Sequence, residues 1–238
     1  AREGFEALLR WNRRGHGYIS PERFIPIAEE CGLIGQIGAW VLAEACRQIA
    51  DWEHGGYGWH RVAINVSARQ LMHDDLAGMI RGECACYGIS PALLEVEVTE
   101  SCVMSNPERT TPILDALRAM RVTVAIDDFG TGHSSLAYLR RLPVDVIKID
   151  RSFIHETSSD ASAAAIVKTI IALSKTLRMG VVAEGVETAE QVALLAEAGC
   201  DALQGYFFAK PLPAGDIERQ WRAGTHGPTP VARPLNPA

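Results

Sequence analysis

The chain has 238 residues, which fits one large domain, because single hydrophobic cores stop growing near roughly 250 residues. Hydrophobic residues make up 47% and charged residues 22% of the sequence, which excludes wholesale disorder and fibrous architectures. The 29 acidic and 23 basic residues give a formal net charge of −6, which argues against a protein that holds long DNA or RNA on a basic surface.

Helical and strand patterns alternate along the chain, with end signals such as Ser20-Pro21 before the first helix and Thr188 with Gln191 as a capping box before the last. The strands are short apolar runs, typical of strands covered on both faces. In chain order the predicted elements are a helix over Glu22–Cys31, a helix over Gln36–Trp52, strands Val62–Val66 and Leu94–Val98, a helix from Asn106 to about Met120, strands Val122–Ile126 and Val146–Ile149, a helix over Ser162–Leu177, strand Val181–Ala183, a helix that closes at Gly199, and a short strand run from Ala202 to Phe208.

This alternation predicts an α/β fold in which βα units surround a parallel sheet. No Gly/Ser linker or charge block interrupts it, so we expect a single domain over residues 1–224. After Gly224 the chain becomes rich in proline and loses its periodicity. The tail, residues 225–238, is therefore expected to be disordered or loosely packed.

The chain shows no membrane or secretion signal. No apolar run reaches the roughly 18 residues that a membrane helix needs, so this piece is not expected to span or contact a bilayer. The first residue is Ala1 and no secretory pattern follows it, which indicates an excised or trimmed domain. Six cysteines without a CxxC pair indicate reduced thiols. We expect a cytoplasmic domain, in a full-length protein that could be membrane-tethered.

Polar or charged residues stand at the carboxyl end of almost every predicted strand. In a closed parallel barrel these ends converge on one mouth, where barrel enzymes keep their active sites. A single carboxylate at a strand end is usually a turn residue or a helix cap, but the agreement of five strand ends favours a functional site. The residues are Asn65, Glu97, Asp127, Asp128, Lys148, Asp150, Glu184 and Gln204.

The residue types at these strand ends narrow the chemistry. Carboxylates with one amide, and no His or Cys, form a hard oxygen site suited to Mg²⁺ or Mn²⁺. The adjacent acids Asp127 and Asp128 are suited to two ions, which would clamp the attacking and leaving oxygens of a phosphoryl displacement. Lys148 adds a positive charge that could orient the nucleophilic water or stabilise the transition state.

The segment Gly130-Thr131-Gly132 follows a strand and superficially suggests a dinucleotide-binding fingerprint. The third glycine of that fingerprint is missing, with Ser135 in its place. We therefore favour a mobile glycine loop over the mouth, with Ser134 and Ser135 as caps of the helix that follows. Elsewhere, Arg10 lies just after Glu6, which makes it a candidate for phosphate binding.

Seven segments between Phe5 and Leu212 resemble, in order, the signatures of the EAL-domain phosphodiesterases. That family has a modified (β/α)8 TIM-like barrel and hydrolyses the bacterial second messenger cyclic di-GMP to linear pGpG with two divalent cations, Mg²⁺ or Mn²⁺. The matching segments are Glu6-Ala7-Leu8-Leu9-Arg10-Trp11, Ile64-Asn65-Val66-Ser67, Glu97-Val98-Thr99-Glu100, Asp127-Asp128-Phe129-Gly130-Thr131-Gly132, Lys148-Ile149-Asp150, Glu184-Gly185-Val186-Glu187 and Gln204-Gly205-Tyr206.

The resemblance implies a role for each matching residue. Lys148 resembles the lysine that holds the catalytic water, Glu184 has also been cast as a general base, and Glu100 matches the glutamate that steadies the glycine loop. The ligands of one metal ion correspond to Glu6, Asn65, Glu97 and Asp127, and those of the second to Asp127, Asp128 and Glu184. The substrate contacts correspond to Leu8, Arg10, Asp150, Glu187, Gln204 and Pro211.

The chain departs from the family pattern in two places. His133 stands in the glycine loop where the family usually has tyrosine, which could alter dimer contacts or loop ordering. The strand that usually precedes Glu6, with a Gln-Pro pair, is absent from this sequence, so the barrel is expected to look incomplete at its N-terminal side.

The family also implies a homodimer, and a sensory or GGDEF domain upstream in the full-length protein. The leading functional hypothesis is an active phosphodiesterase. One alternative is a catalytically silent cyclic di-GMP-binding sensor or interaction module. Another is an unrelated metal-dependent barrel that acts on a different phosphodiester.

Overall fold

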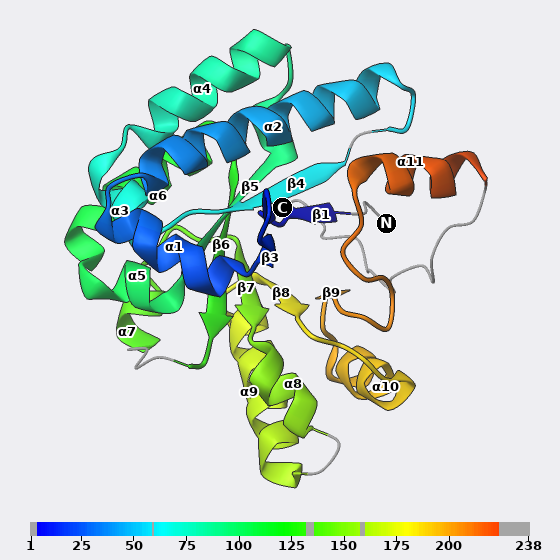
Figure 1. The fold of residues 1–238 in the computed structure, drawn as a ribbon. Helices are drawn as coiled ribbons and strands as arrows, with labels where there is room; N and C mark the ends of the chain where they lie inside the picture. Colours follow the sequence, from blue (N-terminus) through cyan, green and yellow to red (C-terminus); the bar gives the residue numbers. More distant parts are fainter. Residues whose placement is uncertain (1–3, 59, 132–135, 158–159, 224–238) are drawn as a thin grey trace.

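A computed structural model describes residues 4–58, 60–131, 136–157 and 160–223 of the chain. Its main sheet has seven parallel strands, in the order β1-β4-β5-β6-β7-β8-β9 (Figure 1). β1 and β9 are the two edges, so the sheet is an open half-barrel in the described residues. The strands are β1 Gly4–Ala7, β4 Arg61–Asn65, β5 Leu94–Thr99, β6 Thr123–Phe129, β7 Val146–Ile149, β8 Gly180–Ala183 and β9 Ala202–Leu203.

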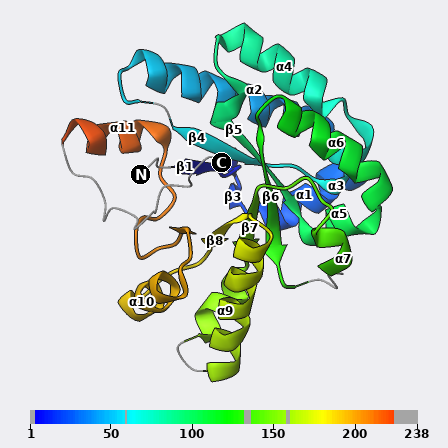
Figure 2. The same cartoon turned by 180° about the vertical axis from the view of Figure 1, so that it is seen from behind.

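Helices surround the outer side of this curved sheet, as the two opposite views in Figure 1 and Figure 2 show. The predicted α/β fold with a parallel, barrel-like sheet is therefore confirmed, and the open edge agrees with the expected incompleteness at the N-terminal side. The helices are α1 Pro21–Glu30, α2 Ile34–His54, α3 Ala68–His73, α4 Leu76–Tyr87, η1 Pro91–Leu93, α5 Glu100–Ser105, α6 Pro107–Ala119, α7 Leu136–Leu139, α8 Arg151–Glu156, α9 Ala161–Thr176, α10 Ala189–Ala198 and α11 Ala214–Arg222.

The hydrophobic core lies between the sheet and these helices. Strand alternation sends one set of side chains outward, such as Val96 and Ile147, and both are fully buried. They belong to one cluster with helix residues such as Leu42, Leu114 and Val167. Burying each of these side chains contributes about 1.5–3 kcal/mol. The opposite set of side chains points to the hollow of the half-barrel.

Most predicted elements are found within two or three residues of their expected ends. The capping box of Thr188 and Gln191 is confirmed at the start of α10. Ser20 precedes α1, with Pro21 as its first residue, but its side chain makes no capping hydrogen bond. The predicted strand over Ala202–Phe208 was too long, because the chain leaves the sheet after Leu203 and turns, with the Phe208 amide donating to the Gly205 carbonyl.

Several elements were not predicted. α4 has a readable signal, with Asp75 as its N-cap, Leu76, Ile80 and Cys84 at helical spacing and left-handed Gly88 at its end. α11 contains no buried residue, but Ala214, Ile217 and Trp221 recur at helical spacing, so its signal too could be read from the sequence. The glycine-loop residues Gly132, His133, Ser134 and Ser135 and the tail, residues 225–238, lie outside the described residues, so those expectations stay predictions.

Two smaller features flank the main sheet. An antiparallel hairpin, β2 Trp11–Arg13 and β3 Gly17–Ile19, follows β1, and Trp11 packs edge-on against Phe24 of α1 at 5.4 Å between ring centroids. α11 lies beside β1, as both ribbon views show. Its Trp221 ring lies 5.6 Å from Phe5 and 5.4 Å from Trp52, so the last described helix covers the outer face of the first strand.

Across the described residues, no helix combines the length and the apolar character required to cross a membrane.

Candidate active site

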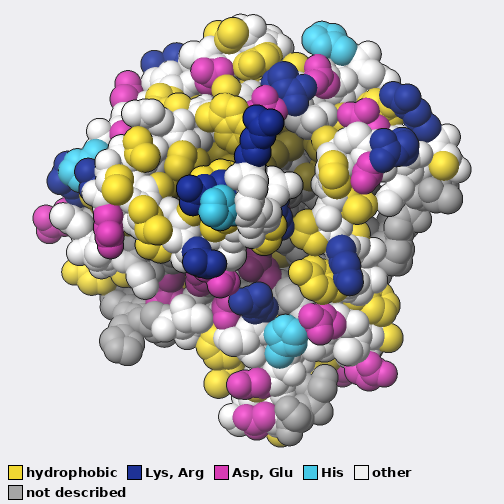
Figure 3. Space-filling model, in the orientation of Figure 1, with side chains coloured by type: hydrophobic (Ala, Val, Ile, Leu, Met, Phe, Trp, Pro, Cys, Tyr) yellow, Lys and Arg dark blue, Asp and Glu magenta, His cyan; other side chains and the backbone are white. Residues whose placement is uncertain are grey.

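The inner ends of the strands gather polar side chains into one site. On β5, Val96 and Val98 point outward into the core, while Glu95 and Glu97 point to the hollow. The register sets Asn65 opposite Glu97 and sets Asp127 opposite Thr99, two residues further along β5, so neighbouring strands bring their polar residues to the same end of the sheet. Figure 3 shows acidic side chains gathered near the middle of this face, with Lys and Arg side chains around them.

Glu6, on edge strand β1, joins the two edges of the open sheet. Its Oε1 accepts a hydrogen bond from Asn65 Nδ2 at 2.9 Å, and its Oε2 accepts one from Gln204 Nε2 at 2.7 Å. Gln204 directly follows β9, the opposite edge of the sheet. The side-chain bond between Glu6 and Gln204 therefore spans the seam that backbone pairing leaves open.

Lys148, on β7, lies in the middle of the acids and is only 2% exposed. Its Nζ is 2.6 Å from Glu97 Oε1 and 2.6 Å from Glu184 Oε1. Asp127 Oδ1 at 3.7 Å and Glu6 Oε2 at 3.8 Å complete the surroundings. One buried ammonium therefore holds together carboxylates from four different strands or strand ends.

The pKa values of these groups reflect burial and mutual charge. Burial raises the pKa of Glu97 to about 9 in spite of the nearby Lys148 ammonium, and it raises the pKa of Glu184 to about 7. For Lys148, burial acts to lower the pKa, but the Glu97 and Glu184 carboxylates outweigh it and raise the pKa above its usual value. Perturbed acids that share a cation in a recess are typical of active sites.

A bulge on β6 brings two consecutive acids to the same site. Strand alternation would send Asp127 and Asp128 to opposite faces. The pairing of β6 with β7 shifts register between Ile126 and Phe129, and Asp128 has a φ of 54°. Burial, with the charges of Asp127 and Asp150 nearby, raises the pKa of Asp128, so this carboxyl lies near both acids. The bulge therefore redirects a side chain toward the site.

Two further predicted residues occupy supporting positions. Glu100, 1% exposed at the start of α5, accepts a hydrogen bond from the Gly130 amide at 2.8 Å, which ties it to the beginning of the glycine loop. Asp150 is the N-cap of α8 and accepts from the Ser152 amide at 3.0 Å. Asp150 therefore has a structural task in addition to its predicted substrate contact.

The other predicted substrate contacts are exposed and show no hydrogen bond or ion pair to the acid cluster among the described residues. Leu8 is 41% exposed, Glu187 and Pro211 are exposed, and Arg10 donates to its neighbour's carbonyl, Leu9 O, at 3.0 Å. Their roles stay predictions.

Arg61 was not singled out from the sequence. It makes an ion pair of 3.4 Å with Glu95, one layer below Glu97. Strand alternation places Glu95 on the inner face, and a basic partner for this acid could have been expected on that ground.

A comparison with known families decides the classification. Residues 1–211 match the EAL domain. The chain belongs to the EAL domain family. In Pseudomonas aeruginosa, the bifunctional diguanylate cyclase/cyclic di-GMP phosphodiesterase MucR is 49% identical over 214 residues, which cover 90% of this chain and 31% of MucR. The cyclic di-GMP phosphodiesterase NbdA of the same organism is 44% identical over 233 residues, which cover 98% of this chain and 30% of NbdA.

The fold of this EAL domain also matches solved structures. The P. aeruginosa MucR phosphodiesterase in complex with c-di-GMP superimposes with a TM-score of 0.86 and 48% identity, covering 89% of this chain and 86% of that chain. The present chain spans about a third of the length of the curated relatives that it matches.

Proposed function

We propose that this EAL domain hydrolyses cyclic di-GMP to linear pGpG with the help of two divalent cations. The observation that carries the proposal is the convergence of Glu6, Glu97, Asp127 and Glu184 on one buried lysine. Its relatives MucR and NbdA are named as cyclic di-GMP phosphodiesterases, which supports the same substrate here.

The donor set fits hard divalent cations. All side chains in it offer carboxylate or amide oxygens, which suit Mg²⁺ or Mn²⁺. Glu97 Oε2 is buried and has no hydrogen-bond partner among the described residues, so it is available to a cation. The proposed ligands are Glu6, Asn65, Glu97 and Asp127 for one ion, and Asp127, Asp128 and Glu184 for the other.

The acidic side chains do not form a preformed metal site. Within the part of the chain that the structure describes, no three acidic, histidine or cysteine side chains form a preset metal cage. The Lys148 ammonium lies between them instead. To bind an ion, the carboxylates would therefore have to break some of their contacts with the Lys148 ammonium and form contacts with the ion instead.

In the proposed reaction each residue has a separate task. Bound Mg²⁺ or Mn²⁺ would act as a Lewis acid toward water and phosphate. Lys148 donates hydrogen bonds to the attacking water, and the Glu184 carboxylate accepts the proton of that water as the bond between the phosphorus and the 3′ oxygen of the substrate breaks. Arg10 binds a phosphate of the substrate, and Gln204 orients Glu6 from across the seam.

Substrate contacts at the rim complete the proposal. Leu8, Glu187 and Pro211 are exposed and are proposed to contact a phosphate or a guanine of the substrate. Asp150 is proposed to contact the substrate while it caps α8. Glu100 steadies the glycine loop through Gly130.

Hydrolysis should depend on the divalent ion and on Glu6. We expect pGpG to form from cyclic di-GMP with Mg²⁺ or Mn²⁺ and to be absent with EDTA. Glu6→Gln should lower kcat/KM by about 10²-fold or more, because it removes a charge from the ion site. Chromatography of the products measures both effects. Glu22→Gln, on exposed helix α1, is the control and should retain wild-type turnover.

Two outcomes would contradict the enzyme proposal. Binding of cyclic di-GMP with either ion but no product would favour the silent sensor module. Turnover of other phosphodiesters but not of cyclic di-GMP, in a panel of nucleotides, would favour the unrelated metal-dependent barrel.

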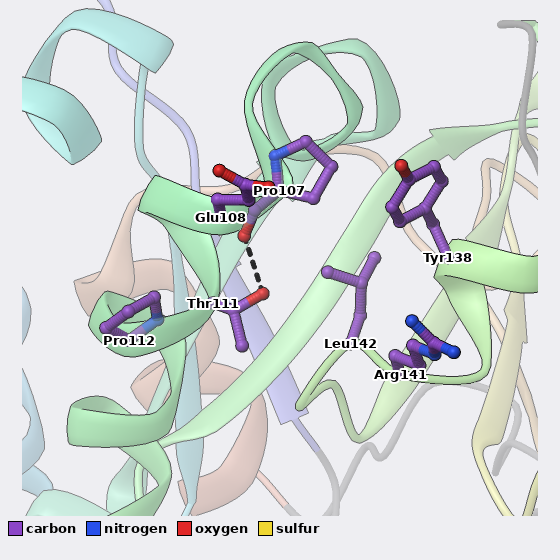
Figure 4. A pocket seen from close by; sticks show the side chains of 7 residues that line it. All are labelled: Pro107, Glu108, Thr111, Pro112, Tyr138, Arg141 and Leu142. Atoms are coloured by element: carbon purple, nitrogen blue, oxygen red, sulfur yellow. Dashed lines mark hydrogen bonds between the residues drawn. The ribbon is translucent and has the colours of Figure 1, made fainter.

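We also propose a homodimer that forms at a groove between α6 and α7. The groove encloses about 400 Å³, and Figure 4 shows the side chains that line it. Tyr138, 51% exposed, is a large aromatic contact at its edge. The groove lies near the glycine loop in the chain, where the family places its dimer contacts. Its lining residues are Pro107, Glu108, Thr111, Pro112, Tyr138, Arg141 and Leu142.

Tyr138→Glu should weaken the dimer, because it places a charge in an apolar contact. We expect sedimentation equilibrium to show a dimer for the wild type and at least a tenfold higher dimer dissociation constant for Tyr138→Glu. Tyr18→Glu changes a tyrosine of similar exposure on the hairpin, 57% against 51%, and should leave the dissociation constant unchanged. A wild type that stays monomeric at high concentration contradicts this proposal.

The domain is further proposed to act within a longer protein. Its curated relatives are about three times as long as the matched part, and MucR is named as a bifunctional diguanylate cyclase and phosphodiesterase. A sensory or GGDEF domain upstream would be the corresponding partner in the full-length protein.

A further inference from the structure

Two buried glutamines close capping boxes directly after two segments of the site. Gln70 is the third residue of α3 and Gln191 is the third residue of α10, and each side chain is 4% exposed. In both boxes the backbone amide of the glutamine donates to the N-cap hydroxyl, of Ser67 or Thr188. The glutamine Oε1 accepts in return from the N-cap amide. The two boxes have the same local geometry.

Gln191 makes two more hydrogen bonds, and Gln70 shows no equivalent of either within the described part of the chain. Its Oε1 also accepts from the Glu187 amide at 2.7 Å, a shorter contact than the 3.1 Å to Thr188. Its Nε2 donates to the Ile154 carbonyl of α8 at 3.1 Å, across 37 residues of sequence. One buried amide therefore connects α8, the start of α10 and the segment that carries Glu187.

The segment from Glu184 to Glu187 is wedged between α8 and the turn after β9. A Cβ on Gly185 would lie 2.5 Å from Arg151 Cβ, so the backbone packs directly on α8. On the other side, the Val186 amide donates to Gln204 O at 3.0 Å. The Phe207 amide donates to Val186 O at 3.0 Å, so the peptide unit between Val186 and Glu187 is held by that bond and by the bond that the Glu187 amide donates to Gln191 Oε1.

We propose that Gln191 is a positioning residue for substrate binding, which acts by fixing the backbone of Glu187. This inference rests on the proposed function, because it takes Glu187 as a contact to the substrate. Gln191 is buried behind the segment and does not itself touch the site. Glu187 is exposed, with its Oε1 4.0 Å from His155 Nε2, so its side chain depends on the backbone for its direction.

Gln70 supplies a matched comparison. Its Nε2 lies 1.7 Å from the place where a Cβ on Gly38 would be, so its amide packs directly on α2. Replacing Gln70 with methionine removes a box of the same kind and the same burial. Comparing Gln70→Met with Gln191→Met therefore separates the effect of losing a capping box from the effect of losing the hydrogen bond to the Glu187 amide.

The experiment compares kcat and KM for cyclic di-GMP with saturating Mg²⁺ in the wild type and three variants. Gln191→Met should raise KM about tenfold with kcat within about twofold, because one buried hydrogen bond that orders the binding segment is lost. Gln191→Glu keeps an acceptor for the Glu187 amide and should keep KM within about threefold. Gln70→Met should lower the thermal midpoint with KM unchanged.

Several results would overturn the inference. One is a Gln191→Met variant that melts at a lower temperature but keeps the wild-type KM, which indicates a structural role only. Another is an equal rise of KM in both methionine variants. A wild type that binds cyclic di-GMP without hydrolysing it refutes the proposed hydrolysis alone, and calorimetric dissociation constants then replace KM in the same comparison. A wild type that neither binds nor hydrolyses it refutes both proposals.

Discussion

Replacing Lys148 with methionine should lower turnover by about 10²–10³-fold, and it should make the stability of the domain depend on divalent cations. The ammonium lies 2.6 Å from both Glu97 and Glu184 and is 2% exposed, so it is the buried counter-charge of the cluster. Removing one partner of a buried ion pair costs about 3–5 kcal/mol. We expect a loss of that order in the free energy of unfolding measured in EDTA.

Divalent cations should reverse much of this loss in the variant. With Lys148 absent, Mg²⁺ or Mn²⁺ is the available counter-charge, and binding to the folded state stabilises it. Thermal unfolding with and without the ions measures the effect, which should be larger in the variant than in the wild type. Turnover should fall by about 10²–10³-fold even with saturating ions, because the water loses its donor.

Lys168→Met is the control for this prediction. Lys168 is exposed on α9, so its replacement should change the unfolding free energy by no more than about 0.5 kcal/mol. Turnover of this variant should equal that of the wild type. If Lys148→Met is as stable as the wild type in EDTA and turns over normally, Lys148 is neither the counter-charge nor a catalytic group.

Gly205→Ala should disrupt the closing side of the site. A Cβ at this position would lie 2.2 Å from both the nitrogen and the oxygen of Val186, which are backbone atoms that cannot rotate away. The same region holds the hydrogen bonds from the Val186 amide to Gln204 O and from the Phe207 amide to Val186 O, each 3.0 Å. We expect a loss of about 2–3 kcal/mol in unfolding free energy.

The activity of Gly205→Ala should fall together with its stability. Gln204 reaches Glu6 from this turn, so a shifted turn breaks the 2.7 Å hydrogen bond between them. Calorimetry should show a thermal midpoint lower by roughly 4–12 °C. Gly82→Ala, in the open middle of α4, is the matched control and should stabilise the helix by about 0.5–1 kcal/mol. Equal thermal midpoints for the two variants would contradict the clash.

Much of the strand pattern could be predicted because burial on both faces leaves a plain apolar run. Val146–Ile149 is found with the expected ends, and all four of its residues are buried, including Lys148. The acids at strand ends were readable for the same reason, because a charged residue next to such a run is conspicuous. Their convergence could be predicted without knowing any particular contact, because the carboxyl ends of parallel strands lie at the same end of a sheet.

Other parts of the site depend on contacts that no local pattern encodes. The bulge at Asp127 and Asp128 arises from pairing with β7, so alternation alone would have separated these acids. The hydrogen bond from Gln191 to Ile154 joins residues 37 positions apart, and the local capping pattern gives no indication of it. The packing of Trp221 on Phe5 joins opposite ends of the described chain. Such tertiary contacts override or supplement local propensity.

The bond between Glu6 and Gln204 has a consequence for the order in which the domain is made. The two residues lie 198 positions apart, so a chain that is still being synthesised holds Glu6 long before Gln204 exists. Contacts of such high sequence separation form after local ones, because closing a long loop costs entropy first. A ribosome-bound intermediate that ends before residue 204 would carry most of the acids without their last partner. The proposed active site is therefore complete only after translation has passed this point and both edges of the sheet have met.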